Sequence, residues 1–409
     1  MTELFSLGKL YPSDFIGKDE TPRCEPVELK LLMDENGTVR LEKTAPKEFM
    51  WGAYWYRSGI NNTMRQALQD IVLSITKIFN CKDGGIWLDI ACNDGTLLSF
   101  VPPTMIPVGI DPAEDSFKIE ALKHAAFHIQ DYFDSAAIKK APSFYHKKAK
   151  VITAIAMFYD VQEPDKFLND IREILDDDGL LVMQLSYTPL MFEQMAFDNI
   201  LHEHYYYYSL FILKKLLEKN GFQIMDCQLN DVNSGSFRVY IMKQNANIQR
   251  FGSQPYRDVC NFRMKSLLEY EKTLMLDEKK TWENFYDKIN SLKDQLLAFI
   301  RNEKSKGKTI YAYAASTKGN TFLQYFDLNA SLIDGIADKN YLKWGLRTVG
   351  TNIPIVSEDE MRKNQPDYVL ILAWHFISEF REREKEYLDN GGKFIVPCPK
   401  FQIIEKCKH

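Results

Sequence analysis

The sequence predicts an α/β protein with two parallel sheets joined by helices, and three observations carry this prediction. Five strand-like runs alternate with helix patterns between residues 85 and 186. A stretch from Phe262 to Lys306 contains no proline and is rich in helix-forming residues. A second series of strand-like runs, again alternating with helix patterns, fills the chain from Thr309 onwards. Because strands that alternate with helices form parallel sheets with crossover helices, we expect two doubly wound, Rossmann-like sheets.

The individual elements follow from local patterns. The apolar alternation VELKLLM (27–33) indicates a small β-containing module at the N-terminus. A helix is expected over 62–79, after an asparagine cap at Asn61 or Asn62. Strands are expected at 85–91, 107–111, 125–130, 151–157 and 179–186, and then at 309–316, 332–338, 353–357, 368–374 and 393–399. We therefore expect an N-terminal module (1–60), a first α/β domain (61–245), a helical linker (246–306) and a second α/β domain (307–409).

Composition and charge exclude several functional classes. The 409 residues are 45% hydrophobic and 26% charged, as in folded soluble proteins, and the net charge of −5 argues against general affinity for nucleic acid or anionic membranes. No secretion signal and no apolar run long enough to cross a bilayer are found. Seven scattered cysteines without a CxxC pair indicate reduced thiols. We expect a cytoplasmic protein, either a monomer or a homodimer.

The segment LDIACNDGTLL (88–98) lies where the first strand of the first sheet turns into a helix. A glycine in such a turn lets a ligand approach the backbone, and acids at strand ends accept from hydroxyl or cationic groups. The pyrophosphate pattern GxGxxG is absent, which favours a nucleoside without phosphates. Asp111 ends the second strand, where a ribose diol needs an acceptor, and Gln130 and Asp131 can meet an adenine edge. The alternative is a set of unrelated strand-end acids.

The run HEHYYYYSL (202–210) places two histidines around a glutamate. Histidines two residues apart do not share a helical face, so this is not the HExxH zinc pattern. A metal site, a merely hydrogen-bonded segment and an acid/base site remain open. In the last case, a neutral imidazole and a carboxylate together take a proton near neutral pH. The four tyrosines are expected to be packing and pocket wall.

Five motifs distributed over nearly the whole chain resemble those of one family. They are MWGAYWYRSGINNTM (50–64), LDIACNDGTLL (88–98), AMFYD (156–160), AFDNILHEHYYYYSL (196–210) and YAYAASTKGNTFLQYF (311–326). In this order they resemble the sugar C-methyltransferases of deoxysugar biosynthesis. That family has an N-terminal zinc-binding module, a central class I, Rossmann-like methyltransferase domain that uses S-adenosyl-L-methionine, and a Rossmann-like C-terminal domain. The resemblance implies methylation of a carbon beside the keto group of a nucleotide-diphosphate 4-keto sugar.

The resemblance and the motifs together nominate three groups of residues. For catalysis we expect His204 as the base with Glu203 beside it, His202 or a tyrosine hydroxyl stabilising the enolate, and Tyr54 and Tyr56 lining the sugar pocket. For the methyl donor we expect Asp89, Cys92, Asn93, Asp94, Gly95, Asp111, Gln130, Asp131 and Met157. For the sugar nucleotide we expect Tyr159, Ser316, Thr317, Lys318, Asn320, Arg347 and His375. A small-residue loop before a helix, with a lysine, suits a phosphate.

This chain departs from the family pattern in three places. Its N-terminal region lacks the paired zinc cysteines, so no structural zinc is expected. Leu201 stands where many members have tyrosine, and Met157 to Asp160 replace a common histidine. An oxygen or nitrogen acceptor therefore remains an alternative to carbon. A non-catalytic sugar-nucleotide binding protein is a remote alternative, since none of Asp89, Gly95 or the Glu203–His204 pair is lost.

Overall fold

The computed structural model describes residues 1–52, 55–142 and 147–406. The chain forms two compact units that are interleaved along the sequence. The seven-stranded unit comprises Pro46–Thr188 and Tyr205–Met275, and the composite unit comprises Met1–Ala45, Pro189–His204 and Leu276–His409. The sequence predicts four consecutive domains, 1–60, 61–245, 246–306 and 307–409, and this division stays a prediction.

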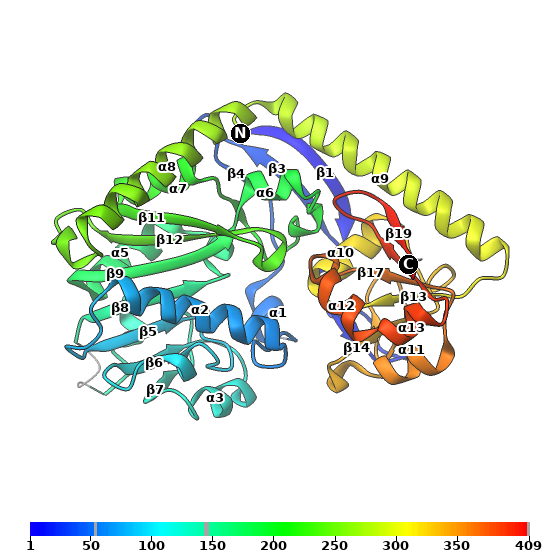
Figure 1. Ribbon diagram of the computed structural model, residues 1–409, viewed down its shortest axis with the longest axis horizontal. Coiled ribbons are helices and arrows are strands. Elements are labelled where there is room, and N and C mark those ends of the chain that lie inside the picture. Colours follow the sequence, from blue (N-terminus) through cyan, green and yellow to red (C-terminus); the bar gives the residue numbers. More distant parts are fainter. Residues whose placement is uncertain (53–54, 143–146, 407–409) are drawn as a thin grey trace. The chain divides into compact units, whose positions relative to one another are not determined.

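The seven-stranded unit begins with two helices and continues as alternating strands and helices (Figure 1). Its helices are α1 (Lys47–Gly52), α2 (Asn62–Ile78), α3 (Asp115–Ala121), α4 (Ser135–Ile138), α5 (Pro164–Ile174), α7 (Leu210–Lys219) and α8 (Gln254–Leu274). Its strands are β5 (Ile86–Ile90), β6 (Ile106–Ile110), β7 (Phe127–Ile129), β8 (Ala149–Ile155), β9 (Leu175–Ser186), β10 (Tyr206–Tyr207), β11 (Phe222–Asn230) and β12 (Ser236–Lys243). Short 3₁₀ turns are η1 (Leu98–Phe100), η3 (Phe158–Asp160), η5 (Val232–Ser234) and η6 (Ile248–Arg250).

The main sheet of this unit has the order β11-β12-β9-β8-β5-β6-β7, which Figure 1 shows from top to bottom. β5 to β9 run parallel, which confirms the α/β prediction for this region, and β12 is antiparallel to both β9 and β11. β11 and β12 are strands that the sequence reading did not anticipate. The strand order reverses between β5 and β8, so ligands are expected at the carboxyl ends of these two strands.

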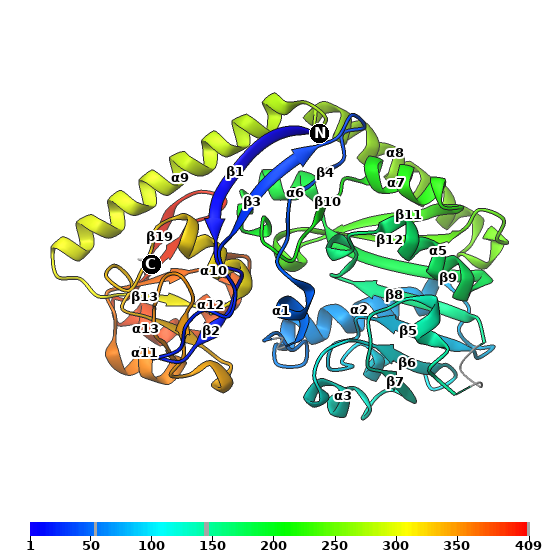
Figure 2. The same cartoon turned by 180° about the vertical axis from the view of Figure 1, so that it is seen from behind.

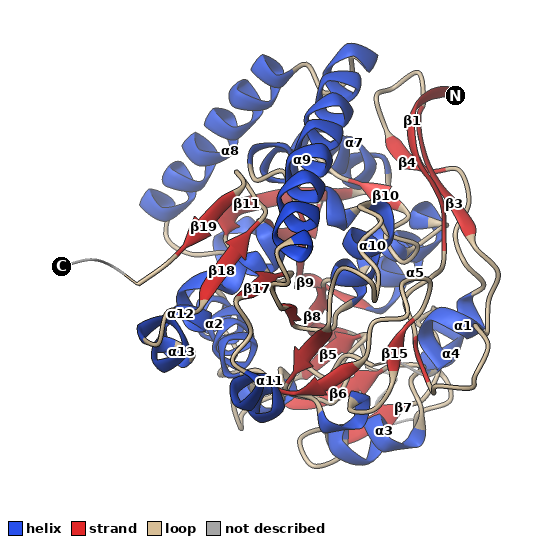
Figure 3. Ribbon diagram, turned by 90° about the vertical axis from the view of Figure 1, so that its right-hand side faces the viewer, coloured by secondary structure: helices blue, strands red, loops and turns tan. Residues whose placement is uncertain are grey.

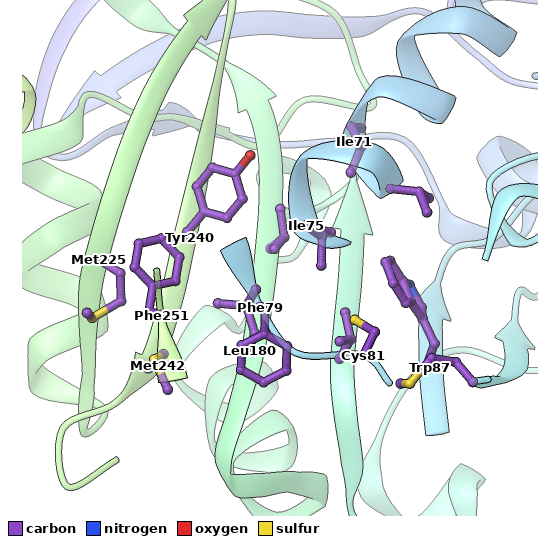
Figure 4. Close-up of a cluster of buried hydrophobic side chains, with 14 of the residues drawn as sticks. Ile71, Ile75, Phe79, Cys81, Trp87, Leu180, Met225, Tyr240, Met242 and Phe251 are labelled. Carbon is purple, nitrogen blue, oxygen red and sulfur yellow. The ribbon is translucent and has the colours of Figure 1, made fainter. Parts of the chain in front are cut away.

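One face of this sheet is covered by α2, as the apolar spacing of its sequence predicts. Asn61 caps the helix, because its side chain accepts a hydrogen bond from the Thr63 N–H at 2.9 Å. Figure 4 shows the resulting core, in which Ile71 and Ile75 of α2 lie with Trp87 and other buried side chains of the sheet. Full burial of each large apolar side chain contributes about 1.5–3 kcal/mol, so this cluster stabilises the packing of α2 against the sheet.

The composite unit joins an N-terminal sheet to the second α/β sheet (Figure 2). Its strands are β1 (Thr2–Leu10), β2 (Phe15–Ile16), β3 (Val27–Met33), β4 (Val39–Leu41), β13 (Ile310–Tyr313), β14 (Gly335–Asp338), β15 (Arg347–Thr348), β16 (Ile355–Ser357), β17 (Tyr368–Ile371), β18 (Lys393–Val396) and β19 (Gln402–Ile404). Its helices are α9 (Lys279–Ser305), α10 (Thr317–Tyr325), α11 (Glu358–Asn364), α12 (Ile377–Arg383) and α13 (Lys385–Asp389), with α6 (Thr188–Glu193) starting at its boundary. Its 3₁₀ turns are η4 (Phe197–Asn199), η7 (Tyr341–Lys343) and η8 (Trp374–Phe376).

The second α/β sheet has the order β16-β14-β13-β17-β18-β19, in which only β19 is antiparallel to its neighbour. If the strands of this sheet are numbered along the chain from β13, their order is 3-2-1-4-5-6, which is the strand order of dinucleotide-binding folds. The order reverses between β13 and β17. The loops after these two strands, 314–316 and 372–376, therefore mark the expected ligand position. The long α9 helix of this unit stands out in Figure 3.

The N-terminal segment is attached to α10 of the second sheet. The Tyr11 N–H donates to Oε1 of Gln324 at 2.8 Å, and Nε2 of Gln324 donates to the Tyr11 carbonyl at 3.0 Å. β2 pairs with β15 nearby, so that Ile16 lies opposite Arg347. The N-terminal module is therefore part of the same compact unit as the C-terminal sheet.

Candidate functional site

The turn after β5 has the backbone geometry of a ligand-binding loop. Ala91, Asn93 and Gly95 all have positive φ angles, of 55°, 53° and 75°. A Cβ atom at Gly95 would come within 2.7 Å of the Cα atom of Ala121, the last residue of α3. Only glycine therefore fits this position without a shift of the turn or of α3.

Asp111, just after β6, braces this turn. Its carboxylate accepts from the Asn93 N–H at 2.8 Å and from the Ala113 N–H at 2.8 Å. Burial raises the pKa of Asp111, and the two backbone hydrogen bonds oppose that rise. The carboxylate keeps lone pairs beyond these two bonds, as a hydroxyl-bearing ligand such as ribose requires.

Asp89, the fourth residue of β5, is a second buried acid at this edge. Its Oδ1 accepts from the Thr153 hydroxyl of β8 at 2.6 Å, and that hydroxyl oxygen accepts from the Trp87 indole at 3.2 Å. Burial raises the pKa of Asp89 to about 7, the charge of Asp111 adds to the rise, and the bond from Thr153 opposes it. Among the ion pairs of the described residues, no cation neutralises either acid. These two acceptor carboxylates fit a ligand that brings positive charge and hydroxyl groups, as S-adenosylmethionine does.

Asn93 and Asp94 hold the segment before α2 against the turn. Oδ1 of Asn93 accepts from the Ser58 N–H at 3.0 Å, and its Nδ2 donates to the Tyr56 carbonyl at 3.1 Å. Oδ2 of Asp94 accepts from the Gly59 N–H at 2.8 Å. Tyr56 itself is 42% exposed, and Tyr54 lies outside the described residues. The two predicted donor-site residues therefore also position the motif that carries Tyr56.

The other predicted residues of this unit occupy more varied places. Cys92 is buried, and burial raises its thiol pKa well above the usual value, which leaves it un-ionised. Nε2 of Gln130 donates to the Ala113 carbonyl at 3.0 Å, whereas Asp131 forms an ion pair with Lys140. Met157 is half-buried just after β8, and Tyr159 is buried in η3. Asp131 is thus already paired with a cation, unlike Asp89 and Asp111.

The two histidines of the HEH segment, both in the composite unit, are used differently. His202 is buried, and its Nε2 lies 3.0 Å from the Val27 carbonyl of β3. Burial lowers its pKa to about 4. Burial likewise lowers the pKa of His204 to about 3, the charge of Lys318 adds to this, and a hydrogen bond to the Asn199 backbone opposes it. A ring nitrogen that donates to a carbonyl leaves the second nitrogen of a neutral imidazole as a proton acceptor.

Glu203, between them, is half-buried, and burial raises its pKa to about 8. Its carboxyl group is therefore mostly protonated at neutral pH and can donate a hydrogen bond. The segment thus presents a neutral base and a neutral acid side by side in the chain.

Four of the predicted sugar-nucleotide residues, Ser316, Thr317, Lys318 and His375, follow the two strands between which the order of the second sheet reverses. Ser316 caps α10, with its Oγ accepting from the Gly319 N–H at 3.0 Å. Thr317 and Lys318 form the first turn of the helix. His375 lies in the loop after β17, and its pKa is lowered to about 3 by burial and by the charge of Lys318. Lys318 therefore acts electrostatically on both His204 and His375.

Asn320 and Arg347 are engaged by their own surroundings. Nδ2 of Asn320 donates to Oγ of Ser13 and to the Asp14 carbonyl, each at 3.3 Å, while its Oδ1 has no partner within the described chain. Nη1 of Arg347 donates to the carbonyl of Asn352 at 3.5 Å. Asn320 of α10 thus contacts the N-terminal segment, and Arg347 lies in the short strand β15, paired with β2.

Asp338, the last residue of β14 in the second α/β sheet, repeats the hydrogen-bonding pattern of Asp111. It accepts from the Ala315 N–H at 2.8 Å and from the Asn340 N–H at 2.7 Å. Here, however, Nζ of Lys343 lies 3.5 Å from Oδ2 and donates to the Ala315 carbonyl at 2.6 Å. Asp338 already has its cation and Asp111 has none among the described ion pairs, so only the seven-stranded sheet offers an open acid after its second strand.

The sequence reading missed two side chains at these edges. Thr153, in the middle of β8, orients Asp89 by donating a hydrogen bond to it. This role follows from the pairing of β8 with β5 and leaves no local pattern in the sequence. Asp198, four residues before His202, is buried, and the charge of Lys318 acts on it. Its place in the FDN run just before the HEH segment is the sequence feature that could have pointed to it. Within the described residues, no group of three or more His, Cys, Asp or Glu side chains is arranged to hold a metal ion.

Two family models match the chain in succession. A methyltransferase domain model matches residues 60–226, and a C-methyltransferase C-terminal domain model matches residues 231–399. The chain is also 28% identical to the C-methyltransferase NovU of Streptomyces niveus over 367 residues, which cover 90% of this chain and 84% of NovU.

Solved structures match only part of the chain. The magnesium protoporphyrin IX methyltransferase ChlM of Synechocystis PCC 6803 with bound SAM is 13% identical over 44% of this chain and 79% of its own, with a TM-score of 0.32. A putative S-adenosylmethionine dependent methyltransferase from Listeria monocytogenes is 13% identical over 44% of this chain and 100% of its own, with a TM-score of 0.34.

In the described part of the chain, no helix is both long and apolar enough to cross a membrane.

The matched domains follow one another along most of the sequence, and the acidic turn after β5 lies within the first of them. The chain is therefore an S-adenosylmethionine-dependent methyltransferase, and its two matched regions are similar to the domains of C-methyltransferases.

Proposed function

We propose that this enzyme methylates a carbon beside the keto group of a nucleotide-diphosphate-linked 4-keto deoxysugar. The observation that carries the proposal is the state of the HEH segment. His204 is buried and neutral with one ring nitrogen engaged by Asn199, and Glu203 beside it is protonated at neutral pH. A neutral base and a neutral acid are what removal of a proton beside a ketone requires.

The roles follow from these protonation states. His204 takes the proton from the carbon beside the ketone, and Glu203 donates a hydrogen bond to the oxygen on which negative charge develops. A carboxylic acid kept neutral by burial is an established way to stabilise an enolate. His202 takes no part in this step, because backbone hydrogen bonds to both Val27 and Leu10 engage its ring, whereas His204 has one such bond, to Asn199.

The methyl donor is assigned to the edge formed by Asp89, Asp111 and the turn around Gly95. S-adenosylmethionine, when bound, supplies an electrophilic methyl group. Asp111 accepts from ribose hydroxyls, and Asp89 favours a positively charged ligand because no described cation offsets its charge. Tyr205, the residue after His204 in the chain, donates its N–H to the Tyr159 carbonyl just after β8, at 2.9 Å.

The sugar nucleotide is assigned to the loops after β13 and β17. A phosphate group is stabilised at the first turn of a helix by free N–H groups, and Lys318 adds a positive charge there. A phosphate near Lys318 also offsets the charge that depresses the pKa of His204, which strengthens His204 as a base when substrate is present.

The test is incubation with a panel of nucleotide-diphosphate 4-keto sugars and S-adenosylmethionine labelled with ¹³C in its methyl group. The proposal expects a product whose labelled methyl carbon is bonded to ring carbon by NMR. A label on oxygen or nitrogen would contradict the choice of acceptor. Absence of transfer to every sugar in the panel would contradict the substrate class.

A further inference from the structure

The backbone that carries His204 is a short hydrogen-bonded turn. The His204 N–H donates to the Leu201 carbonyl at 3.1 Å, which closes residues 201–204 into a turn with His202 inside it. Leu201 and His202 are buried, at 1% and 3% exposure. Because one hydrogen bond links the ends of this turn, a contact that fixes His202 also fixes the backbone from which the His204 ring projects.

The imidazole ring of His202 lies at the end of the ladder formed by β1 and β3, two strands that run side by side (Figure 2). Its Nε2 is 3.0 Å from the Val27 carbonyl, and a backbone hydrogen bond to Leu10 engages the same ring. Leu10 ends β1, Val27 begins β3, and the two residues are partners in the ladder. A carbonyl only accepts, so the Nε2 atom that faces Val27 carries the proton of the neutral ring. Two strands therefore hold this ring in one orientation.

The backbone of His202 is held separately, by Thr44. The Thr44 hydroxyl donates to the His202 carbonyl at 2.6 Å. Thr44 follows β4, and β4 pairs with β3, so this bond also comes from the N-terminal sheet of β1, β3 and β4. The sheet and the turn belong to the same compact unit. His202 is thus fixed at its ring and at its carbonyl by one structural element.

The same contacts leave His202 badly suited to proton transfer. Its N–H already donates to a backbone carbonyl, and transfer of that proton to a substrate would break the bond to Val27. Burial lowers the pKa of the ring to about 4, so the imidazole is neutral in the working enzyme. The structure therefore uses this histidine as a rigid hydrogen-bonding group.

We propose that His202 is a positioning residue, through which the N-terminal sheet holds the turn that presents His204 to the substrate. Proton transfer requires the base within hydrogen-bond reach of the proton, so a small displacement of the His204 ring slows the reaction more than it weakens binding. The role of His204 as the base rests on the proposed function, whereas the anchoring of the turn does not. The N-terminal module thereby acquires a part in catalysis.

The first experiment compares two replacements of His202 by steady-state kinetics, with the 4-keto sugar nucleotide that wild type methylates. His202→Gln keeps an N–H donor but cannot exchange a proton near neutral pH, and His202→Leu keeps the bulk without a donor. We expect His202→Leu to lower kcat about 10- to 100-fold with KM for S-adenosylmethionine changed less than about threefold, and His202→Gln to stay within about threefold of wild type with the same pH profile. Equal losses in both variants would show a chemical role of the imidazole and overturn the proposal, as would full activity in both.

The second experiment leaves His202 intact and removes the contact to its carbonyl, which keeps the proposal testable if His202→Leu does not fold. Thr44→Val deletes the hydroxyl at nearly constant size, and we expect kcat to fall about fivefold or more and Thr44→Ser to restore it. The matched control is Ser6→Ala, which removes a hydroxyl that donates to Oε1 of Glu28 at 3.0 Å between β1 and β3. This control should keep kcat within about twofold of wild type. Full activity in Thr44→Val, or an equal loss in Ser6→Ala, would contradict the proposal.

The third experiment follows the position of His204 without any substrate. Protein labelled with ¹⁵N in its histidine rings is measured by NMR, and His204→Gln identifies the His204 signals. We expect these signals to move in Thr44→Val and His202→Leu and to stay in place in Ser6→Ala. Unmoved His204 signals in a variant that has lost activity would overturn the positioning role. If wild type methylates no sugar of the panel while the signals move as expected, the proposed substrate is wrong and the anchoring of His204 by His202 stands.

Discussion

Replacing Gly95 with alanine tests the geometry of the donor turn. Gly95 has a φ angle of 75°, which costs an L-residue about 1–2 kcal/mol. The added Cβ atom would also lie 2.7 Å from the Cα atom of Ala121, and relief of such a clash with backbone costs about 1–3 kcal/mol more. We therefore expect Gly95→Ala to destabilise the seven-stranded unit by about 2–5 kcal/mol and to weaken binding of S-adenosylhomocysteine.

The matched control is Gly221→Ala in the same unit. Gly221 has a nearly equal φ angle of 81°, but its added Cβ would meet only the end of the flexible Arg172 side chain, at 3.3 Å. This variant should show the backbone cost of about 1–2 kcal/mol alone, with donor binding unchanged. Urea unfolding followed by a fluorescence probe, with calorimetric titration of S-adenosylhomocysteine, measures both quantities. Equal stability and equal binding in the two variants would refute the steric argument.

Three further predictions concern the charged and titratable groups of the two edges. His204→Ala should lower kcat by about 10²- to 10⁴-fold while S-adenosylhomocysteine binds normally in calorimetry; undiminished turnover would remove His204 from the mechanism. Glu203→Gln, which keeps an uncharged donor, should retain more kcat than Glu203→Ala, and equal losses in steady-state assays would contradict the hydrogen-bonding role. The pKa of Asp89 is about 7 in the free protein, and a cationic ligand favours its ionised form. Affinity for S-adenosylmethionine should therefore fall below about pH 7, by up to about tenfold per pH unit. Asp89→Asn should abolish this dependence in calorimetric titrations, and an unchanged pH profile in that variant would disprove it.

Much of the fold was predictable because buried parallel strands leave a clear mark in the sequence. The runs that become β5, β6 and β8 are short and largely apolar, as expected for strands covered on both faces, whereas β9 begins four residues before its predicted run, at Leu175. The helix over 62–79 was predicted to within one residue, since its apolar spacing and Asn61 cap are both local features. The edge strand β11 was missed because its mixed pattern of exposed and buried residues does not alternate regularly.

The composite unit was less predictable because its contacts join distant parts of the chain. Gln324 binds Tyr11 across 313 positions, and His202 meets Val27 across 175 positions, and neither pairing leaves a local pattern. The same limit applies to the site. The acids after β5 and β6 could be nominated from strand ends, whereas the environment of Asp198 exists only after η4 packs onto α10.

The central claim is that His204 removes a proton from a carbon beside a ketone. Its most direct test is incubation of the enzyme with nucleotide-diphosphate 4-keto sugars in deuterated buffer, with S-adenosylhomocysteine in place of the methyl donor. We expect wild type to exchange the proton on the carbon beside the keto group for deuterium, as seen by NMR, and His204→Ala not to do so. Exchange at the same rate in both proteins, or no exchange in wild type with a sugar that it methylates, would rule out His204 as the base.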